Sequence, residues 1–280
     1  MKTLIIGNGW IGNRCNEEWP DATLSDKKIN TVQDVIDLLD EYQPDTVLNA
    51  AGIVGKPNVD WCEDHQFETI AGNTFLPIMI AEACQRKNVY LLHIGTGCIF
   101  YGEAPDKKSW KENDFANPAA IYTRTKYAAD LVLSELPNIG IARVRMPVDN
   151  RPSPGNLIDK LISYPRIVDV ENSITIIPDM IRVFYEILEK RASGIFHVTN
   201  TNPIKHREII EMYKEIVDSS QQNEWITAED LVTTGLAKKG RSNNIMHSEN
   251  LEKFDIHMKP IKEALREALV DYLKKKTEIN

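Results

Sequence analysis

The sequence predicts an α/β fold, in which a doubly wound parallel sheet is joined to a smaller C-terminal lobe. Short β-branched or leucine-rich runs alternate with helical patterns through the first 150 residues, as expected of βαβ units. The first run leads directly into a glycine-rich turn, and the alternation breaks after Pro147. With 280 residues and 42% hydrophobic content, the chain can form one large domain or a main domain with an appended lobe.

The elements of the first unit follow in chain order. Each predicted strand is a short apolar run, and each predicted crossover helix has apolar residues at helical spacing. The strands are expected at Thr3–Ile6, Ala22–Leu24, Thr46–Asn49, Tyr90–Ile94 and Ile139–Arg145. The helices between them are expected at Val32–Glu41 and Phe67–Arg86.

The rest of the chain is expected to divide between two units. The stretch 151–156 reads RPSPGN, which is typical of a loop, and a strand at Ile195–Val198 returns to the alternating style. We therefore expect residues 1–150, joined by 175–200, to form the first domain, and residues 151–174 and 201–280 to form the second. The remaining predicted elements are helices at Leu157–Ile162, Lys205–Val217 and Pro260–Lys275 and a polar loop at Arg241–Asn244.

The composition argues against several classes of function. The net charge of −8 lacks the basic footprint of a nucleic-acid surface, and the KKK run at 274–276 fits a solvated helix end. The four cysteines form no CxxC pair and have no zinc-like spacing with the six histidines, so neither disulfides nor a metal site is expected. No apolar run approaches the roughly 18 residues that suggest a membrane span. We expect a cytoplasmic protein that binds neither nucleic acid nor membrane.

The stretch Thr3–Gly12 reads TLIIGNGWIG, so a strand leads straight into glycines at G-x-G-x-x-G spacing. The first glycine allows a tight turn, the second a close approach to a pyrophosphate, and the third close helix-to-strand packing. The N–H groups that begin the next helix then face the phosphates. A plain tight turn is the alternative, but the context favours a dinucleotide site of the Rossmann type. Its predicted residues are Gly7, Asn8, Gly9, Trp10, Ile11 and Gly12.

The residues after the second strand bear on the choice of dinucleotide. An acid there binds the ribose 2′-hydroxyl of NAD, whereas a base favours the 2′-phosphate of NADP. That segment, Ser25–Lys28, reads SDKK, and Arg14 follows the glycine turn. Asp26 favours NAD, while Lys27, Lys28 and Arg14 favour NADP. We therefore expect NADPH, bound in part by Arg14 and Lys28, with NADH as the alternative.

The stretch Ile121–Lys126 reads IYTRTK and places Tyr122 and Lys126 on one helix face, at i and i+4. An ammonium one turn away stabilises a phenolate, so the pair can exchange a proton with a substrate oxygen while hydride moves at the adjacent carbon. A solvated helix face is the alternative, but the glycine turn and a strand end at Thr96 favour catalysis. Further cofactor contacts are predicted at Asn49, Ala50, Ala51, Gly52, Tyr122 and Lys126.

These motifs together resemble the extended short-chain dehydrogenase/reductase family over nearly the whole chain. Within it, the sequence is similar to the bifunctional 3,5-epimerase/4-reductases that make rhamnose from UDP- or dTDP-4-keto-6-deoxyglucose. The resemblance implies an NAD(P)H-dependent oxidoreductase with a Rossmann domain, a substrate-binding lobe and a Ser/Thr-Tyr-Lys trio at Thr96, Tyr122 and Lys126. The similar stretches are NAAGIVGKPNVDWCEDH at 49–65, GTGCIF at 95–100, RVRMPV at 143–148, EIIEMYKE at 208–215 and RSNN at 241–244.

Cys98 is either a packing residue or a chemical one. A ketone at C4 of the sugar makes the hydrogens on C3 and C5 acidic, so a base and an acid on opposite faces could invert either carbon. Cys98 lies two residues past Thr96 and would face the same side of a strand. Related GDP-fucose synthases, which also epimerise, have a cysteine in the equivalent run, and this favours a catalytic Cys98. The resemblance places the matching acid at Lys160, for which an exposed helix lysine is the alternative.

The resemblance also implies contacts to the nucleotide sugar and partners for the reaction. Arg241 matches an arginine-bearing loop and is expected to bind the diphosphate, with a plain surface arginine as the alternative. Asn73 and Asn156 are expected polar contacts to the substrate. The glycine turn begins at residue 7, so we expect a separate 4,6-dehydratase to supply the ketone. A homodimer is one expected assembly, because helix-mediated dimers are common among the resembled enzymes.

Two other functions stay open at this point. One is a simple 4-ketoreductase with no epimerase step, and the other is a non-catalytic regulatory subunit that keeps only the dinucleotide site. His197, inside the apolar run IFHV, is expected to be a satisfied core histidine. His65, Asp60 and Glu63 receive no catalytic step. The sequence does not discriminate between UDP and dTDP.

Overall fold

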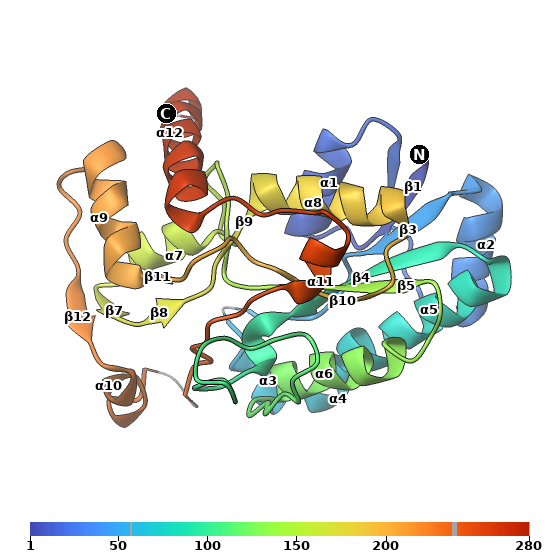
Figure 1. Ribbon diagram of the computed structural model, residues 1–280, viewed down its shortest axis with the longest axis horizontal. Helices are drawn as coiled ribbons and strands as arrows, with labels where there is room; N and C mark the ends of the chain where they lie inside the picture. The colour runs from blue at the N-terminus through green and yellow to red at the C-terminus, as the bar shows by residue number, and fades with distance from the viewer. Residues whose placement is uncertain (57, 237–239, 280) are drawn as a thin grey trace.

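The computed structural model describes residues 1–56, 58–236 and 240–279 of the chain. Its main body is a six-stranded parallel sheet in the order β10-β5-β4-β3-β1-β2, with helices on both faces (Figure 1). This confirms the predicted doubly wound α/β fold. The strand order reverses between β1 and β3, and ligands of such sheets bind at that point. The strands are β1 (Thr3–Ile6), β2 (Ala22–Ser25), β3 (Thr46–Asn49), β4 (Tyr90–Thr96), β5 (Ile139–Val144) and β10 (Gly194–Val198).

Different helices cover the two faces of the sheet (Figure 1). One strand shows why both faces attract helices: in β1, Leu4 and Ile6 pack into one apolar cluster, whereas Ile5 packs into the other. The buried apolar runs in the strands therefore supply both cores. One face carries α2 (Val32–Tyr42), α5 (Leu76–Lys87) and α6 (Ile121–Leu133), and the other carries α1 (Trp10–Glu18) and α8 (Ile177–Lys190).

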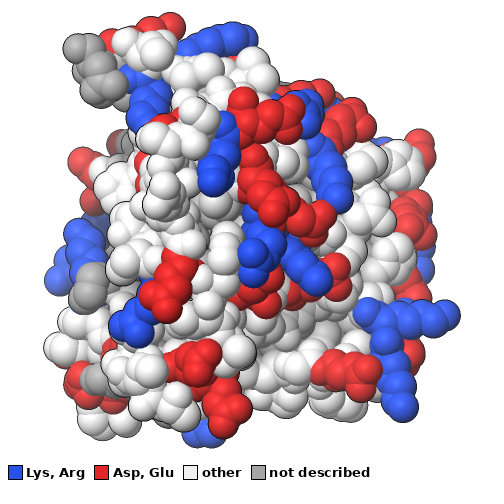
Figure 2. Space-filling view, turned by 90° about the vertical axis from the view of Figure 1, so that its left-hand side faces the viewer, with Lys and Arg blue, Asp and Glu red and all other residues white. Residues whose placement is uncertain are grey.

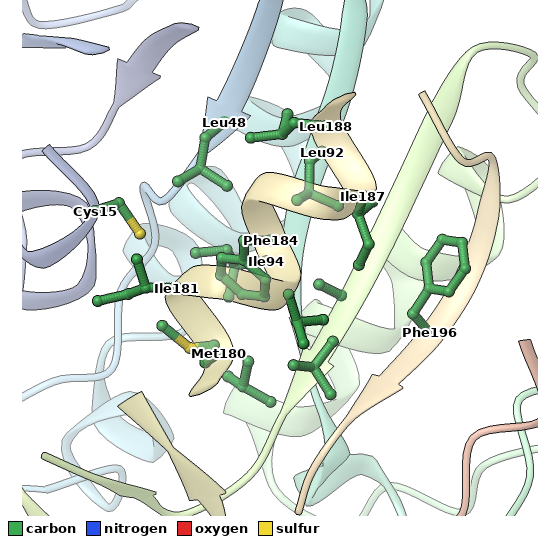
Figure 3. Packing of buried hydrophobic residues seen from close by; sticks show 14 of the residues in the cluster. Cys15, Leu48, Leu92, Ile94, Met180, Ile181, Phe184, Ile187, Leu188 and Phe196 are labelled. Carbon is green, nitrogen blue, oxygen red and sulfur yellow. The ribbon is translucent and has the colours of Figure 1, made fainter. Parts of the chain in front are cut away.

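Helix α8 packs along the sheet through one continuous apolar stripe. Figure 3 shows its side chains against Leu48 of β3 and against Leu92 and Ile94 of β4. Each buried aliphatic or aromatic side chain of this kind contributes about 1.5–3 kcal/mol. The sequence analysis assigned no helix to this segment, although the apolar residues recur at helical spacing. The buried residues of the stripe include Ile177, Met180, Ile181, Phe184, Ile187 and Leu188.

The predicted helix Phe67–Arg86 is divided into α4 (Gln66–Ile70), a π-helical turn η1 (Ala71–Phe75) and α5. The wide turn presents Asn73 to the loop after β3. There the Asn73 amide accepts a hydrogen bond from Ile53 N and donates one to Ile53 O, both at 2.8 Å. Such turns often occur at functional sites, and this one anchors a loop at the carboxyl end of the sheet.

The second unit has an apolar cluster of its own, formed by residues of three helices and several short strands (Figure 1). The helices are α7 (Leu157–Ser163), α9 (His206–Ile216) and α12 (Ile261–Ile279). The strand pairs are β6 (Pro147–Val148) with β9 (Thr175–Ile176), β7 (Arg166–Val168) with β12 (Glu224–Ile226), and β8 (Glu171–Asn172) with β11 (Ile204–Lys205). A short helix, α10 (Ala228–Thr233), follows β12.

Acidic and basic side chains are interleaved on the outer face of this unit (Figure 2). Lys262 pairs with Glu208 at 2.6 Å, and Arg266 pairs with Glu215 at 3.0 Å, so these contacts join α12 to α9. Among the helices of the described residues, none combines the length and the apolar character needed to cross a bilayer.

One segment inside the predicted second domain, 201–280, packs on the sheet instead. Helix α11 (Glu249–Lys253) lies beside β10, where Leu251 joins the sheet cluster and Asn250 Nδ2 donates to Ile195 O at 2.7 Å. Glu112 accepts a hydrogen bond from Glu249 N at 3.2 Å and so holds the start of the helix. The predicted boundary is therefore too simple, because this segment returns to the sheet edge after the polar loop.

Candidate active site

The three glycines of the first turn lie in three different surroundings. Gly7 has a φ of +119°, and a Cβ on it would lie 2.4 Å from Ala51 N. A Cβ on Gly12 would lie 2.1 Å from Gly7 O, whereas one on Gly9 would meet no described atom within 4 Å. The space over Gly9 is open, and it lies at the N-terminus of α1, where no side chain caps the helix. A pyrophosphate fits there.

A cavity of about 1110 Å³ extends from this turn along the carboxyl edge of β1 and β2. Its walls include Lys28, as the sequence predicts, and its volume is ample for the adenosine half of a dinucleotide. Asn8 lies at its mouth and accepts a hydrogen bond from Asn13 Nδ2 at 2.8 Å. The cavity is lined by Ile6–Asn8, Ser25–Asn30, Ala51–Ile53, Glu68, Ala71, Gly72, Phe75, Leu76, Ile78 and Met79.

The side chains of Trp10 and Ile11, the two other residues of the turn, do not line this cavity. Ile11 packs against the sheet cluster, and the Trp10 indole lies so close to Gly155 that a Cβ there would be 2.5 Å from it. Asn49 shapes the NAAG turn, since its Oδ1 accepts from Ala51 N at 3.1 Å. Ala50 N donates to Ile6 O at 2.8 Å, which joins this turn to β1.

Arg14, predicted to bind a 2′-phosphate, is directed elsewhere. It is buried, and its Nε donates to Asp149 Oδ2 at 3.0 Å, across 135 positions of sequence. Glu17 and Glu18 accept further hydrogen bonds from its Nη1. These contacts favour a structural tie between α1 and the end of β6 over a contact with the cofactor, because the guanidinium is already neutralised.

Thr96 and Tyr122 converge at the carboxyl end of β4. Thr96 is the last residue of that strand, and Tyr122 lies in the first turn of α6. Glu63 Oε1 accepts from Ile121 N at 2.9 Å and so fixes the start of the helix. Burial raises the pKa of Tyr122, and negative charge on Cys98 raises it further, while the Thr96 hydroxyl opposes the rise. Tyr122 thus carries its proton at neutral pH.

Lys126 completes the predicted trio on the buried side of α6. Its Nζ donates to Ile94 O at 2.6 Å and lies 3.4 Å from His93 Nε2. Asn49 Oδ1 is taken by an N–H donor, so Asn49 Nδ2 must donate to His93 Nδ1, at 2.9 Å. The neutral His93 ring therefore carries its proton on Nε2, facing the lysine. Burial lowers the pKa of Lys126 to about 8, while the Asp130 carboxylate opposes that shift.

Cys98 lies close to Tyr122, but not for the reason that its spacing suggested. β4 ends at Thr96, and Cys98 lies in a 3₁₀ turn, η2 (Gly97–Ile99), so the strand-alternation reason was wrong. The turn is held by Cys98 N, which donates to Thr96 Oγ1 at 3.2 Å. The half-buried sulfur accepts from Arg145 Nη1 at 3.3 Å. It is also near enough to Tyr122 to act on its pKa.

The other predicted catalytic and substrate residues lie in different surroundings. Lys160 is exposed on α7, where partial desolvation lowers its pKa. Asn156 is fully buried, caps α7 by accepting from Ile158 N at 3.1 Å, and donates to Asp149 O. Asn73 is fully buried as well, with its amide bonded to Ile53. Both asparagines thus support loops at the cleft, and direct contact of either with substrate stays a prediction.

Arg241 faces the first unit across the cleft. Its guanidinium forms a two-pronged ion pair with Asp60, Nη1 to Oδ1 and Nη2 to Oδ2, both at 2.8 Å. Asp60 immediately precedes α3 (Trp61–Asp64). Sequence reasoning left Asp60 without a role, because nothing local marks a partner so distant in the chain.

The remaining histidines agree with the sequence reading. His197 is fully buried, its Nδ1 lies 3.0 Å from His247 O, and its Nε2 lies 3.3 Å from Arg143 Nη1, which confirms a satisfied core residue. His65 stacks on Trp61 at 3.7 Å between ring centroids. No group of His, Cys, Asp or Glu suited to a metal ion is found within 1–56, 58–236 and 240–279.

Comparison with known proteins identifies the family that this chain matches. The family described as the RmlD substrate binding domain matches residues 14–274. A bifunctional dTDP-4-dehydrorhamnose 3,5-epimerase/dTDP-4-dehydrorhamnose reductase from Arabidopsis thaliana is 33% identical over 287 residues, covering 99% of this chain and 94% of that protein. The UDP-rhamnose synthase L780 of Acanthamoeba polyphaga mimivirus has a TM-score of 0.89 at 28% identity, over 97% of this chain and 99% of its own. A dTDP-4-dehydrorhamnose reductase from Bacillus anthracis, solved with NADP, shares the fold at a TM-score of 0.80 and 20% identity, over 97% and 99% of the two chains.

Proposed function

This chain belongs to the family of the RmlD substrate binding domain, and from that premise we propose that it is an NADPH-dependent 3,5-epimerase/4-reductase. The family resemblance seen in the sequence is confirmed. The proposed substrate is UDP- or dTDP-4-keto-6-deoxyglucose, and the product is the nucleotide-linked L-rhamnose. The single observation that carries the proposal is the convergence of a thiol, a hydroxyl and a phenol, Cys98, Thr96 and Tyr122, at the carboxyl end of β4.

The reduction step uses the trio. NADPH, when bound, supplies the hydride, and the glycine turn and the Lys28 side of the cavity are suited to hold it. The Thr96 hydroxyl binds the ketone oxygen, and Tyr122 gives that oxygen its proton. Lys126, one turn along α6, stabilises the phenolate that remains. A dTDP-4-dehydrorhamnose reductase solved with NADP supports NADPH over NADH.

The epimerisation step uses Cys98 as the base. Its sulfur removes a proton from the carbon next to the ketone, and the electron pair of that C–H bond passes into an enolate. A proton delivered to the opposite face inverts the carbon. We assign that delivery to Lys160, whose lowered pKa suits proton transfer.

The rest of the machinery is assigned to binding and supply. Arg241 binds the diphosphate by exchanging Asp60 for phosphate oxygens, while Asn73 and Asn156 position the loops that contact the sugar. A separate 4,6-dehydratase supplies the ketone. A homodimer is supported by exposed Leu131 and Val132 on α6, and a cytoplasmic location by the four free thiols.

Product analysis by NMR tests the whole proposal, using UDP- and dTDP-4-keto-6-deoxyglucose with NADPH. A nucleotide-linked rhamnose is the expected product, and binding of NADPH without oxidation would favour a regulatory subunit instead.

The Cys98→Ser variant tests the epimerase step alone. NADPH oxidation with the unepimerised ketone is expected to collapse, while an already epimerised ketone is still reduced. Unchanged turnover of the unepimerised ketone would leave a simple 4-reductase.

A further inference from the structure

Arg145 is a buried cation in contact with Cys98, and it has no part in the proposed reaction as described so far. Its side chain extends from the end of β5 and is 1% exposed. Nη1 donates to Cys98 Sγ at 3.3 Å and to Ser242 Oγ at 3.2 Å, and Nη2 donates to Ser242 O at 2.6 Å and to Asn172 Oδ1. Its Nε is buried without a hydrogen-bond partner among the described residues.

The charge environment of Arg145 differs from that of two other buried arginines. Arg143, two positions earlier and within β5, pairs with Asp130 at 2.8 Å, and Arg14 pairs with Asp149 at 3.0 Å. Within the part of the chain that the structure describes, no carboxylate lies in ion-pair range of Arg145. Burial therefore lowers the pKa of Arg145, because desolvation disfavours its charge. A buried cation without an acid is costly and needs another counter-charge.

Two weak acids face this guanidinium, the Cys98 thiol and the Tyr101 phenol, and negative charge on either one would raise the pKa of Arg145. The sulfur alone of these two accepts a hydrogen bond from it. We propose that Arg145 is the positioning residue and counter-ion of the Cys98 thiolate, and that it thereby makes Cys98 the base of epimerisation. The inference rests on the proposed function.

The charge balance of the step explains why a fixed cation is useful. The thiolate takes the proton from the carbon next to the ketone and becomes a neutral thiol, and the C–H electron pair moves to the enolate. Negative charge thus leaves the sulfur and arrives at the ketone oxygen, near Thr96 and Tyr122. When the thiol later returns its proton to solvent, Arg145 again stabilises the sulfur anion through a charge-assisted hydrogen bond.

The RSNN loop at 241–244 holds Arg145 and the Cys98 turn in place. Ser242 accepts from Arg145 and donates to Phe100 O at 2.6 Å, while Asn244 Nδ2 donates to Gly97 O at 3.0 Å. The same loop therefore holds both the guanidinium and the turn that carries Cys98. These bonds fix the direction of the cation without adding a competing negative charge.

The first test measures the pH dependence of Cys98 alkylation by iodoacetamide, followed by mass spectrometry of its peptide. In Arg145→Met the half-maximal pH is expected to move upward by at least about one unit, and Arg145→Lys should restore part of the shift. Arg207→Met, which removes a guanidinium stacked on Trp225 elsewhere in the second unit, is the matched control and should leave the profile in place.

The other titratable groups near Cys98 and Arg145 should not account for a difference between the alkylation profiles of the variants. Burial raises the pKa of Tyr101 and of Tyr122 above 10, and burial lowers that of His206 below 6.5. Burial lowers the pKa of Lys126 to about 8, but Lys126 donates its hydrogen bond to Ile94 O rather than to the sulfur. An alkylation profile that is the same in Arg145→Met and in the unmodified protein would overturn the proposal.

The second test follows exchange of solvent deuterium into C3 and C5 of the 4-keto sugar nucleotide by NMR. We expect Arg145→Met to slow exchange at least about tenfold relative to its reduction of an already epimerised ketone, and an unchanged ratio of the two rates would contradict the proposal. If Arg145→Met does not fold, Arg145→Gln retains N–H donors without charge and should shift both readouts in the same direction. If the unmodified protein turns over neither ketone, the proposed function fails, while alkylation still decides the pairing of Arg145 with Cys98.

Discussion

The cofactor side and the substrate side of the cleft are built in different ways. The cofactor side comes from the ends of β1, β2 and β3 and from the loops that follow them, so its residues lie within consecutive βαβ units. The substrate side brings together Cys98, Arg145 and Ser242, which come from three separate parts of the chain. The difference teaches that the first side depends on backbone shape and the second on side-chain contacts between distant segments.

Tyr122 lies where the two sides meet, and its loss should give the largest effect. Tyr122→Phe removes the proton donor, so reduction of an epimerised ketone is expected to fall by about 10²–10⁴-fold. NADPH affinity, measured by fluorescence titration, should stay unchanged because the phenol hydroxyl is not needed to hold the phosphates.

The matched control for this change is Tyr127→Phe on the same helix, whose hydroxyl accepts a hydrogen bond from Ala116 N and does not face the trio. Retained reduction in Tyr122→Phe would refute the proton-donor role. It would also mean that Tyr122 does not lie where the cofactor side and the substrate side meet.

Alanine at two glycines should separate folding from cofactor binding on the cofactor side. Gly12→Ala places a methyl group 2.1 Å from Gly7 O, so urea unfolding should show a loss of about 1–3 kcal/mol. Gly9→Ala meets no described atom within 4 Å and has a φ of −95° that alanine accepts, so its unfolding should stay within about 0.5 kcal/mol of the parent.

The affinity for NADPH tests the role of Gly9 separately from folding. Gly9→Ala is expected to weaken NADPH binding at least about tenfold, since the methyl group occupies the space proposed for the pyrophosphate. Normal NADPH affinity in a folded Gly9→Ala protein would show that the dinucleotide does not cross this turn.

The smallest effect is expected from the ion pair that joins the two sides. Asp60→Asn releases Arg241 from a partly exposed pair, so the free energy of unfolding should change by about 1 kcal/mol or less. If Arg241 binds the diphosphate as proposed, Asp60 competes for its guanidinium, so KM for the nucleotide sugar should fall a few-fold in Asp60→Asn, whereas in Arg241→Met it should rise. Parallel changes in both variants would mean that Arg241 does not bind the diphosphate.

Prediction from sequence succeeded where the relevant contacts are short-range. The Tyr122 and Lys126 pair needs one helical turn, and the glycine turn needs a strand, a bend and a helix, so both are encoded within a few residues. Helix α8 was not predicted, even though Phe184 and its neighbours repeat at helical spacing.

The polar contacts of individual side chains are harder to predict from the sequence. Arg14 follows the glycine turn in sequence, but its guanidinium pairs with Asp149, a partner that no local pattern indicates. Asn73 is predicted to contact substrate, yet a π-helical turn directs its amide to Ile53. In each case the spacing places the residue near the cleft, while burial and the available partners decide where its polar atoms bond.

By itself, the sequence determined the alternation of strands and helices, the glycine-rich turn after the first strand and the spacing of the tyrosine and lysine, since each depends on backbone geometry over a few positions. Tertiary structure alone decided that Cys98 faces a cation. The strand before Cys98 ends too early for alternation to direct the sulfur, and Arg145, which directly follows β5, reaches it while held by the loop at 241–244. A buried charge must find its partner wherever the fold brings one within hydrogen-bond distance, and that pairing cannot be read from spacing.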